Sequence, residues 1–276
     1  ACATCARPTV LEGDWTGGTV GARADLGSAF HAVAAEVLRT LRDTGQTSMP
    51  HQECIEVMRE TTAAGPWLLS PGDGTASSTG YDMLVQMVLA LATEEWPNPA
   101  RFLAIEDRLS HEVIGPDGVA RMATGTPDLV IADPPRGLLI IDHKTGMAKP
   151  PTPREIPDDD VIRGLQYMSD HADFQLHVYG LLAFKQWPRA QTVTLRERNW
   201  RWLGPWREAT ITREALEHDE PYLGELMMKL ERAMAEGEGS ELAAPRSGPH
   251  CTSRCPVARS CPIPRERRRL GVLHTK

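Results

Sequence analysis

The chain has 276 residues, of which 41% are hydrophobic and 24% are charged, and its formal net charge is −7. A chain of this length and composition can bury a substantial core, which argues against disorder and predicts one large domain or two small ones. It contains no apolar run of the roughly 18 residues that a membrane-spanning helix needs, and no signal peptide is recognisable. We therefore expect no membrane partner and a cytoplasmic location.

The first hundred residues predict helices. Apolar residues recur at helical spacing from Leu26 to Leu41, so we expect an amphipathic helix over residues 25–43 that ends at Gly45. His31 lies at the border of its apolar face, where it can point inward, although a lone histidine there is more often a packed boundary residue. Two more helices are expected over residues 51–63 and 80–95.

From Arg101 the spacing of the apolar residues becomes that of strands. Residues 102–114 and 119–132 predict two strands joined by a hairpin loop at Gly115-Pro116-Asp117-Gly118. The apolar run at 138–141 predicts a third strand, buried on both faces, which completes a meander. The remaining expected elements are a loop at 147–157, a helix at about 161–187, a strand at 191–202 and a helix at 212–236.

This order of helices, antiparallel strands, helix, strand and helix predicts an α/β fold with a mixed sheet rather than a regular βαβ repeat. We divide the chain into an N-terminal helical part (1–97), a central core (98–242) and a cysteine-rich tail (243–276). We expect the three parts to form one integrated domain.

Two carboxylates and a lysine mark the ends of adjacent strands. Asp128 follows a turn-prone Gly-Thr-Pro, and Asp142 follows four consecutive apolar residues, so both strands are expected to end at a cleft. Asp142 and Lys144 are two residues apart and share one face of a strand, whereas His143 points away. The carboxylates suit Mg²⁺ or Mn²⁺, and Lys144 could orient a water. The alternative is a simple ion pair at a sheet edge.

Gln175 and Tyr179 are spaced i, i+4 in the expected long helix, so they lie on one face a turn apart. Polar side chains on an otherwise apolar face are costly to bury unpaired, which favours a polar cleft. An ordinary amphipathic edge is the alternative.

Taken in order, the patterns G-x-x-x-H, G-x-x-D, D-x-K-T-G and Q-x-x-x-Y between Gly27 and Tyr179 resemble those of the PD-(D/E)XK nuclease superfamily. The similarity is to the RecB-type branch, which includes the CRISPR-associated adaptation exonucleases. The resemblance implies a restriction-endonuclease-like fold with a mixed sheet flanked by helices. It also implies metal-dependent hydrolysis of DNA.

By motif matching, the resemblance assigns roles to individual residues. His31, Asp128, Asp142 and the backbone carbonyl of His143 would bind the metal, Lys144 would be the catalytic lysine, and Gln175 and Tyr179 would contact DNA or support the site. Glu106, Asp107 and His111 fall on a neighbouring strand and match no motif.

The cysteines are clustered near the two ends of the chain. Cys251, Cys255 and Cys261 are close together, but three thiolates need a fourth ligand. In the RecB-type branch, similar chains hold a [4Fe–4S] cluster with three such cysteines and one near the N-terminus. The resemblance therefore implies Cys5 as the fourth ligand, with Cys2 as the alternative. There are two competing interpretations: a zinc site that uses His250, and reduced free thiols. Cys54 is expected to be a core residue.

Residues 245–276 contain eight basic residues against Glu266 alone, a net charge of +7, which leaves −14 on the rest of the chain. Such a tail can bind polyanions locally or be a solvated terminus.

We expect a Mg²⁺- or Mn²⁺-dependent deoxyribonuclease, an exonuclease that acts on single strands or DNA ends. The alternative is a catalytically silent, nucleic-acid-binding partner subunit of a recombination or CRISPR adaptation complex.

Overall fold

The computed structural model describes residues 22–65, 76–145, 174–201, 203 and 206–236. These residues fall into two compact units. The larger unit takes the described residues between 22 and 111 and between 123 and 218, and the smaller unit takes those of 112–122 and 219–236. No helix among the described residues is long and apolar enough to cross a membrane.

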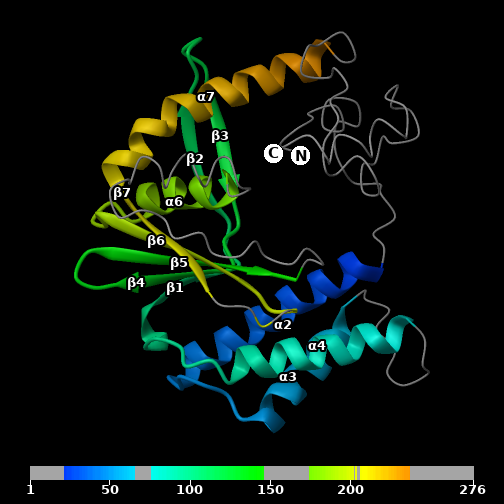
Figure 1. Ribbon diagram of the computed structural model, residues 1–276. Coiled ribbons are helices and arrows are strands. Elements are labelled where there is room, and N and C mark those ends of the chain that lie inside the picture. Colours follow the sequence, from blue (N-terminus) through cyan, green and yellow to red (C-terminus); the bar gives the residue numbers. More distant parts are fainter. Residues whose placement is uncertain (1–21, 66–75, 146–173, 202, 204–205, 237–276) are drawn as a thin grey trace, which may run out of the picture. The chain divides into compact units, whose positions relative to one another are not determined.

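Three helices form one layer of the larger unit (Figure 1). They are α2 (Ala22–Thr44), α3 (His51–Ala64) and α4 (Ala76–Ala92). Their apolar faces meet in a shared core that includes Val33, Met58 and Val88. The helix α2 is followed by Gly45, whose φ of +74° is easily reached by a residue without a Cβ. The three helices predicted here are confirmed, although α4 begins and ends a few residues earlier than expected.

The centre of the larger unit is a five-stranded mixed sheet in the order β1-β4-β5-β6-β7. All neighbouring pairs are antiparallel except β5 and β6, which are parallel. The strands are β1 (Phe102–Ile105), β4 (Leu129–Asp133), β5 (Gly137–Lys144), β6 (Thr192–Asn199) and β7 (Arg207–Thr212). The predicted mixed sheet flanked by helices is confirmed.

The sheet lies between the three-helix layer and α6 (Phe174–Gln186), which covers its other face (Figure 1). Because side chains alternate along a strand, Leu139 and Ile141 join the core that contains α2. On the opposite face, Gly180 of α6 lies close to Val193 of β6. Burial on both sides explains the continuous apolar run of β5, as the sequence indicates.

The smaller unit contains the end of a hairpin and most of a long helix. The strands β2 (Leu109–Ile114) and β3 (Ala120–Gly125) pair as a separate two-stranded sheet, and α7 spans Arg213–Glu236. Arg121 of β3 pairs with Asp117 of the hairpin loop at 2.8 Å and with Glu231 of α7 at 2.7 Å. The expected hairpin loop and last helix are both present.

Two runs that were each predicted to form one continuous strand are interrupted in the structure, so this part of the prediction was wrong. The run at 102–114 divides into β1 and β2, and the run at 119–132 divides into β3 and β4. The first break falls at Glu106, which has a φ of +53°, outside the range of strands. The second break contains Pro127, which has no N–H to donate to a ladder. The strand β1 still pairs with β4, and β4 pairs with β5, as expected for the meander.

The edge strand β7 is absent from the sequence prediction, which assigned no element between residues 202 and 212. The helix expected at 161–187 is described from Phe174 onward as α6. Its first part, the loop expected at 147–157 and the tail that begins at residue 243 lie outside the described residues. The division of the chain at residues 97 and 242 stays a prediction.

Candidate functional site

Asp128 and Asp142 face each other at one end of the sheet. The antiparallel register pairs Leu129 of β4 with Ile141 of β5, and one further step sets Asp128 opposite Asp142. Both residues are buried, with 6% and 3% of their surface exposed. The backbone N–H of His143 donates to Oδ2 of Asp128. Two buried carboxylates at one strand end are unfavourable unless a cation compensates them.

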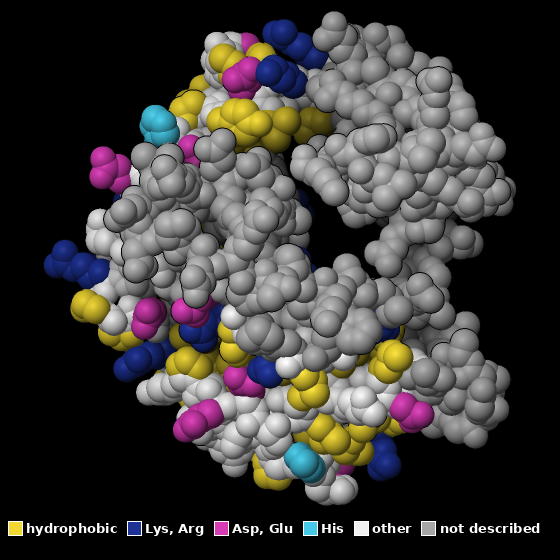
Figure 2. Space-filling model, in the orientation of Figure 1, with side chains coloured by type: hydrophobic (Ala, Val, Ile, Leu, Met, Phe, Trp, Pro, Cys, Tyr) yellow, Lys and Arg dark blue, Asp and Glu magenta, His cyan; other side chains and the backbone are white. Residues whose placement is uncertain are grey.

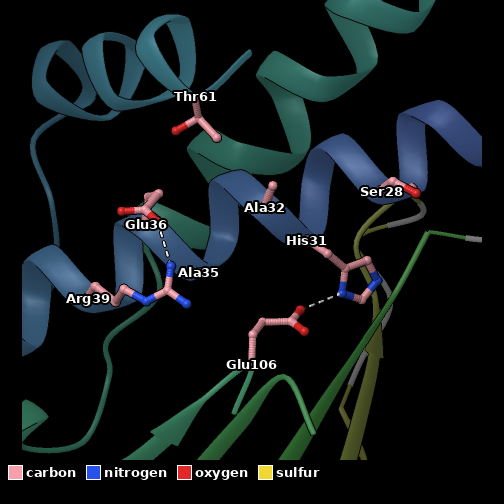
Figure 3. Close-up of a pocket in the computed structure, with 9 residues that line it drawn as sticks. Ser28, His31, Ala32, Ala35, Glu36, Arg39, Thr61 and Glu106 are labelled. Carbon is pink, nitrogen blue, oxygen red and sulfur yellow. Dashed lines mark hydrogen bonds and ion pairs between the residues drawn. The ribbon is translucent and has the colours of Figure 1, made fainter. Parts of the chain in front are cut away.

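His31 reaches these carboxylates from α2. Its Nδ1 lies 2.9 Å from Oδ1 of Asp128 and 3.3 Å from Oε1 of Glu106. Figure 3 shows the imidazole projecting from α2 toward the Glu106 carboxylate. One ligand atom from each of the three residues lies within 4.8 Å of the other two. Carboxylate oxygens are suitable ligands for Mg²⁺ or Mn²⁺, and imidazole nitrogen binds divalent transition metals, so the donor set fits a divalent cation.

The protonation of this cluster reflects its burial and its charges. Burial disfavours the charged form of His31, but hydrogen bonds and charges from Asp128 and Glu106 outweigh it and raise the pKa of His31 to about 10. Burial raises the pKa of Asp128, the charge of Asp142 adds to this effect, and the hydrogen bond from His31 opposes it. Without a bound cation, the carboxylates thus favour the protonated form of His31, while Lys144 pairs with Asp142.

Lys144 connects the carboxylates to α6. Its ammonium forms an ion pair with Asp142, as expected for two residues on one face of β5. Its Nζ also donates to Oε1 of Gln175 at 3.3 Å, and Nε2 of Gln175 donates to the hydroxyl of Tyr179 at 2.5 Å. Burial raises the pKa of Tyr179, so this hydroxyl stays protonated. The i, i+4 pair predicted on the helix thus contacts the lysine, with Gln175 exposed and Tyr179 buried.

The glycines of the first two motifs stand where two elements approach closely. A Cβ on Gly27 of α2 would lie 3.0 Å from Oγ1 of Thr145, which directly follows β5. A Cβ on Gly125 would lie 2.6 Å from Cε1 of Tyr179. Larger residues at either position would push the motifs apart.

His143 lies on the opposite face of β5 from Asp142 and Lys144, as the sequence indicates. Its imidazole is 1% exposed, packs against Phe30, and accepts a hydrogen bond at 2.9 Å from Nε1 of Trp200. Burial lowers the pKa of His143 well below its usual value, and the charges of His31, Arg198 and Lys144 act in the same direction. Its side chain is therefore neutral, and only its backbone is available at the site.

A groove of about 690 Å³ runs along α2, and its lining includes His31 and Glu106 of the cluster. Its polar lining consists of Ser28, His31, Glu36, Arg39, Thr61 and Glu106 (Figure 3). On the face seen in Figure 2, basic side chains of the described residues are scattered among acidic ones rather than gathered in one patch. The buried Trp200 cannot stack on bases, because none of its surface is exposed.

The structure brings together the six side chains predicted at the site: His31, Asp128, Asp142, Lys144, Gln175 and Tyr179. Sequence reasoning left out Glu106, although an acidic pair, Glu106-Asp107, directly follows the apolar run of β1. That pair was a usable signal for a strand that ends at a cleft. Cys2, Cys5, Cys251, Cys255 and Cys261 lie outside the described residues. Cys54 is fully buried, as expected for a core residue.

Comparison with known proteins identifies the family to which this chain is similar. The family model described as the PD-(D/E)XK nuclease superfamily matches residues 11–262 of this chain. A crystal structure of a candidate exonuclease from Eubacterium rectale is 10% identical in sequence and aligns over 74% of this chain and 68% of that one. Its TM-score is 0.37. No curated protein matches the chain.

Proposed function

The chain belongs to the PD-(D/E)XK nuclease superfamily, and we propose that it is a divalent-metal-dependent nuclease that hydrolyses phosphodiester bonds of DNA. Its five-stranded mixed sheet between helical layers agrees with a restriction-endonuclease-like fold. The fold alone does not specify an activity, so the proposal rests on the site.

The observation that carries the proposal is the convergence of four separate motifs at one end of the sheet. The side chains come from α2, from the segment before β4, from β5 and from α6. A simple ion pair between Asp142 and Lys144 would need neither the histidine nor the second buried carboxylate. Their joint presence supports a site for a cation and a phosphate.

His31, Asp128, Asp142 and the backbone carbonyl of His143 would hold the cation, as the motif matching implies. When bound, a divalent cation would polarise the scissile phosphate and lower the pKa of a water molecule. Hydrolysis adds this water across the P–O bond, and we expect it to leave a 5′-phosphate and a 3′-hydroxyl.

Lys144 would stabilise the negative charge that develops on the phosphate. Asp142 and Gln175 fix its ammonium at the strand end, so little reorganisation is needed when the phosphate arrives. Tyr179 keeps its proton and anchors Gln175, and both side chains can contact the DNA backbone or hold the lysine in place. The intact Asp128, Asp142 and Lys144 favour an enzyme over a catalytically silent partner subunit.

The finer assignment follows the resemblance to the RecB-type branch. It implies exonuclease action at DNA ends or on single strands, in repair, recombination or CRISPR spacer acquisition, together with a protein partner of such a pathway. The resemblance also implies a [4Fe–4S] cluster held by Cys251, Cys255, Cys261 and Cys5, and in that case the cluster would be structural.

The substrate claim can be tested with linear and circular DNA. Anaerobically purified protein is incubated with end-labelled linear single- and double-stranded DNA and with circular single-stranded DNA, in Mn²⁺, Mg²⁺ or EDTA. We expect degradation of linear DNA with either metal, no degradation in EDTA, and intact circles. Cleavage of circles would contradict exonuclease action, and cleavage in EDTA would contradict metal dependence.

A further inference from the structure

Glu106 is an acidic side chain at the site that the motif assignment leaves without a role. Its Oε1 lies 3.3 Å from Nδ1 of His31, the same nitrogen that contacts Asp128 at 2.9 Å. The three side chains belong to different parts of the larger unit: α2, the residue that follows β1, and the segment before β4. Glu106 therefore completes a donor set of one imidazole and two carboxylates.

The backbone around Glu106 is held in an uncommon conformation. Its φ of +53° is rarely adopted by residues with a side chain. Arg39 donates to the carbonyl of Ile105 at 3.3 Å, the N–H of Ile105 donates to Asp107 at 3.3 Å, and the N–H of Glu106 donates to the carbonyl of Asp128 at 3.1 Å. These contacts interrupt the strand and hold the backbone at Ile105 and Glu106.

Glu106 is accessible from solvent, unlike the two aspartates. Its side chain is 28% exposed, against 7% for Asp128 and 5% for Asp142. It lines the groove along α2, together with His31 (Figure 3). A cation that enters through this groove would meet Glu106 and His31 before the buried carboxylates.

We propose that Glu106 is a further ligand of the divalent cation, acting with His31 and Asp128 on the groove side of the site. The inference rests on the proposed function, because it assumes that the cluster binds a metal. Carboxylate oxygens are preferred ligands of Mg²⁺ and Mn²⁺, and a further negative charge strengthens the attraction.

The test measures metal binding rather than cleavage. The full chain is purified anaerobically, freed of divalent metal with EDTA, dialysed and titrated with Mn²⁺ by calorimetry. The variants are Glu106→Gln, Glu106→Gly, Asp128→Asn and the control Glu60→Gln, which removes one charge from an exposed position on α3. Glycine adopts a positive φ readily, so Glu106→Gly removes the carboxylate without straining the turn.

We expect both Glu106 variants to raise the dissociation constant for Mn²⁺ about tenfold or more, whereas Glu60→Gln leaves it unchanged. Far-ultraviolet circular dichroism of each variant checks that it is folded. If both Glu106 variants bind Mn²⁺ as tightly as the wild type while Asp128→Asn loses binding, Glu106 is not a ligand and the proposed function stands. If Asp128→Asn also binds normally, the proposed metal site itself is wrong.

Discussion

The ring of Tyr179 lies directly on Gly125. A Cβ at position 125 would be 2.6 Å from Cε1 and 2.7 Å from Cδ1 of that ring. This contact joins the segment that leads to Asp128 with the helix that carries Gln175. The glycine of the second motif is therefore explained by packing, because it lets the Tyr179 hydroxyl reach Gln175.

We expect Gly125→Ala to destabilise the protein by about 1–3 kcal/mol, because the added methyl group must displace a buried ring. The displaced Tyr179 would no longer hold Gln175, so DNA cleavage should fall as well. Urea unfolding measures the first effect, and a cleavage assay at matched concentrations of folded protein measures the second.

A double-mutant cycle separates this clash from a backbone effect. In a Tyr179→Ala background the methyl group has room, so Gly125→Ala should cost much less there than in the wild type. An equal cost in both backgrounds would show that the Tyr179 ring is not the cause.

The stability of the metal-free protein should depend on pH through His31. Its pKa is raised from 6.5 to about 10 in the folded state, so the folded protein binds the proton more tightly than the unfolded chain. This contribution is fully present below pH 6.5 and is lost as the pH rises through 10. We expect the difference in unfolding free energy between the wild type and His31→Gln to shrink from pH 6.5 to 9.5. Denaturant unfolding in EDTA measures it, and a difference that stays constant would refute the shift.

The indole of Trp200 and the imidazole of His143 should stabilise the protein through their hydrogen bond only when both side chains are present. Replacing His143 with leucine leaves the buried indole N–H without its acceptor, which should cost about 1–3 kcal/mol. Trp200→Phe should then be less costly in the His143→Leu background than in the wild type, since the donor is already unsatisfied. Additive free energies of unfolding would contradict the pairing.

The cysteine proposal predicts a visible chromophore. Anaerobically purified protein should be brown, with broad absorbance near 400 nm, and Cys255→Ser should lose it. Cys54→Ala is the matched control, because Cys54 is buried and burial raises the pKa of its thiol to about 11, which makes it unsuited to bind iron. A colourless protein that contains zinc would refute the iron–sulfur assignment.

Much of the fold could be predicted from local patterns. The helical period of α2 and the apolar run of β5 follow directly from which faces are buried. The break at Glu106 does not follow from the spacing of the apolar residues, which is compatible with one long strand over residues 102–114, and only the acidic pair Glu106-Asp107 marks it. The turn depends on a hydrogen bond donated by Arg39 to the carbonyl of Ile105 and on one donated by the N–H of Glu106 to the carbonyl of Asp128, and both partners are distant in sequence.

The residues of the candidate site could be predicted from the sequence more fully than the ends of the strands around it. His31, Asp128 and Lys144 stand in patterns whose spacing reflects one helix face or one strand face, and such local geometry can be read from sequence. Glu106 has no such pattern, since its place depends on how β1 pairs with β4. The strand β7 was missed because it is a short, polar edge strand defined by its pairing with β6.

We propose that Asp142 and Lys144 are the hydrolytic residues of a DNA nuclease. The most direct test is the rate of Mn²⁺-dependent degradation of end-labelled DNA by the wild type, Asp142→Ala and Lys144→Ala. Asp133→Ala is the control, because Asp133 is an exposed residue at the far end of β4. We predict that both site variants lose at least about 100-fold in rate, while the control keeps the wild-type rate. Equal rates in all four proteins would contradict the account.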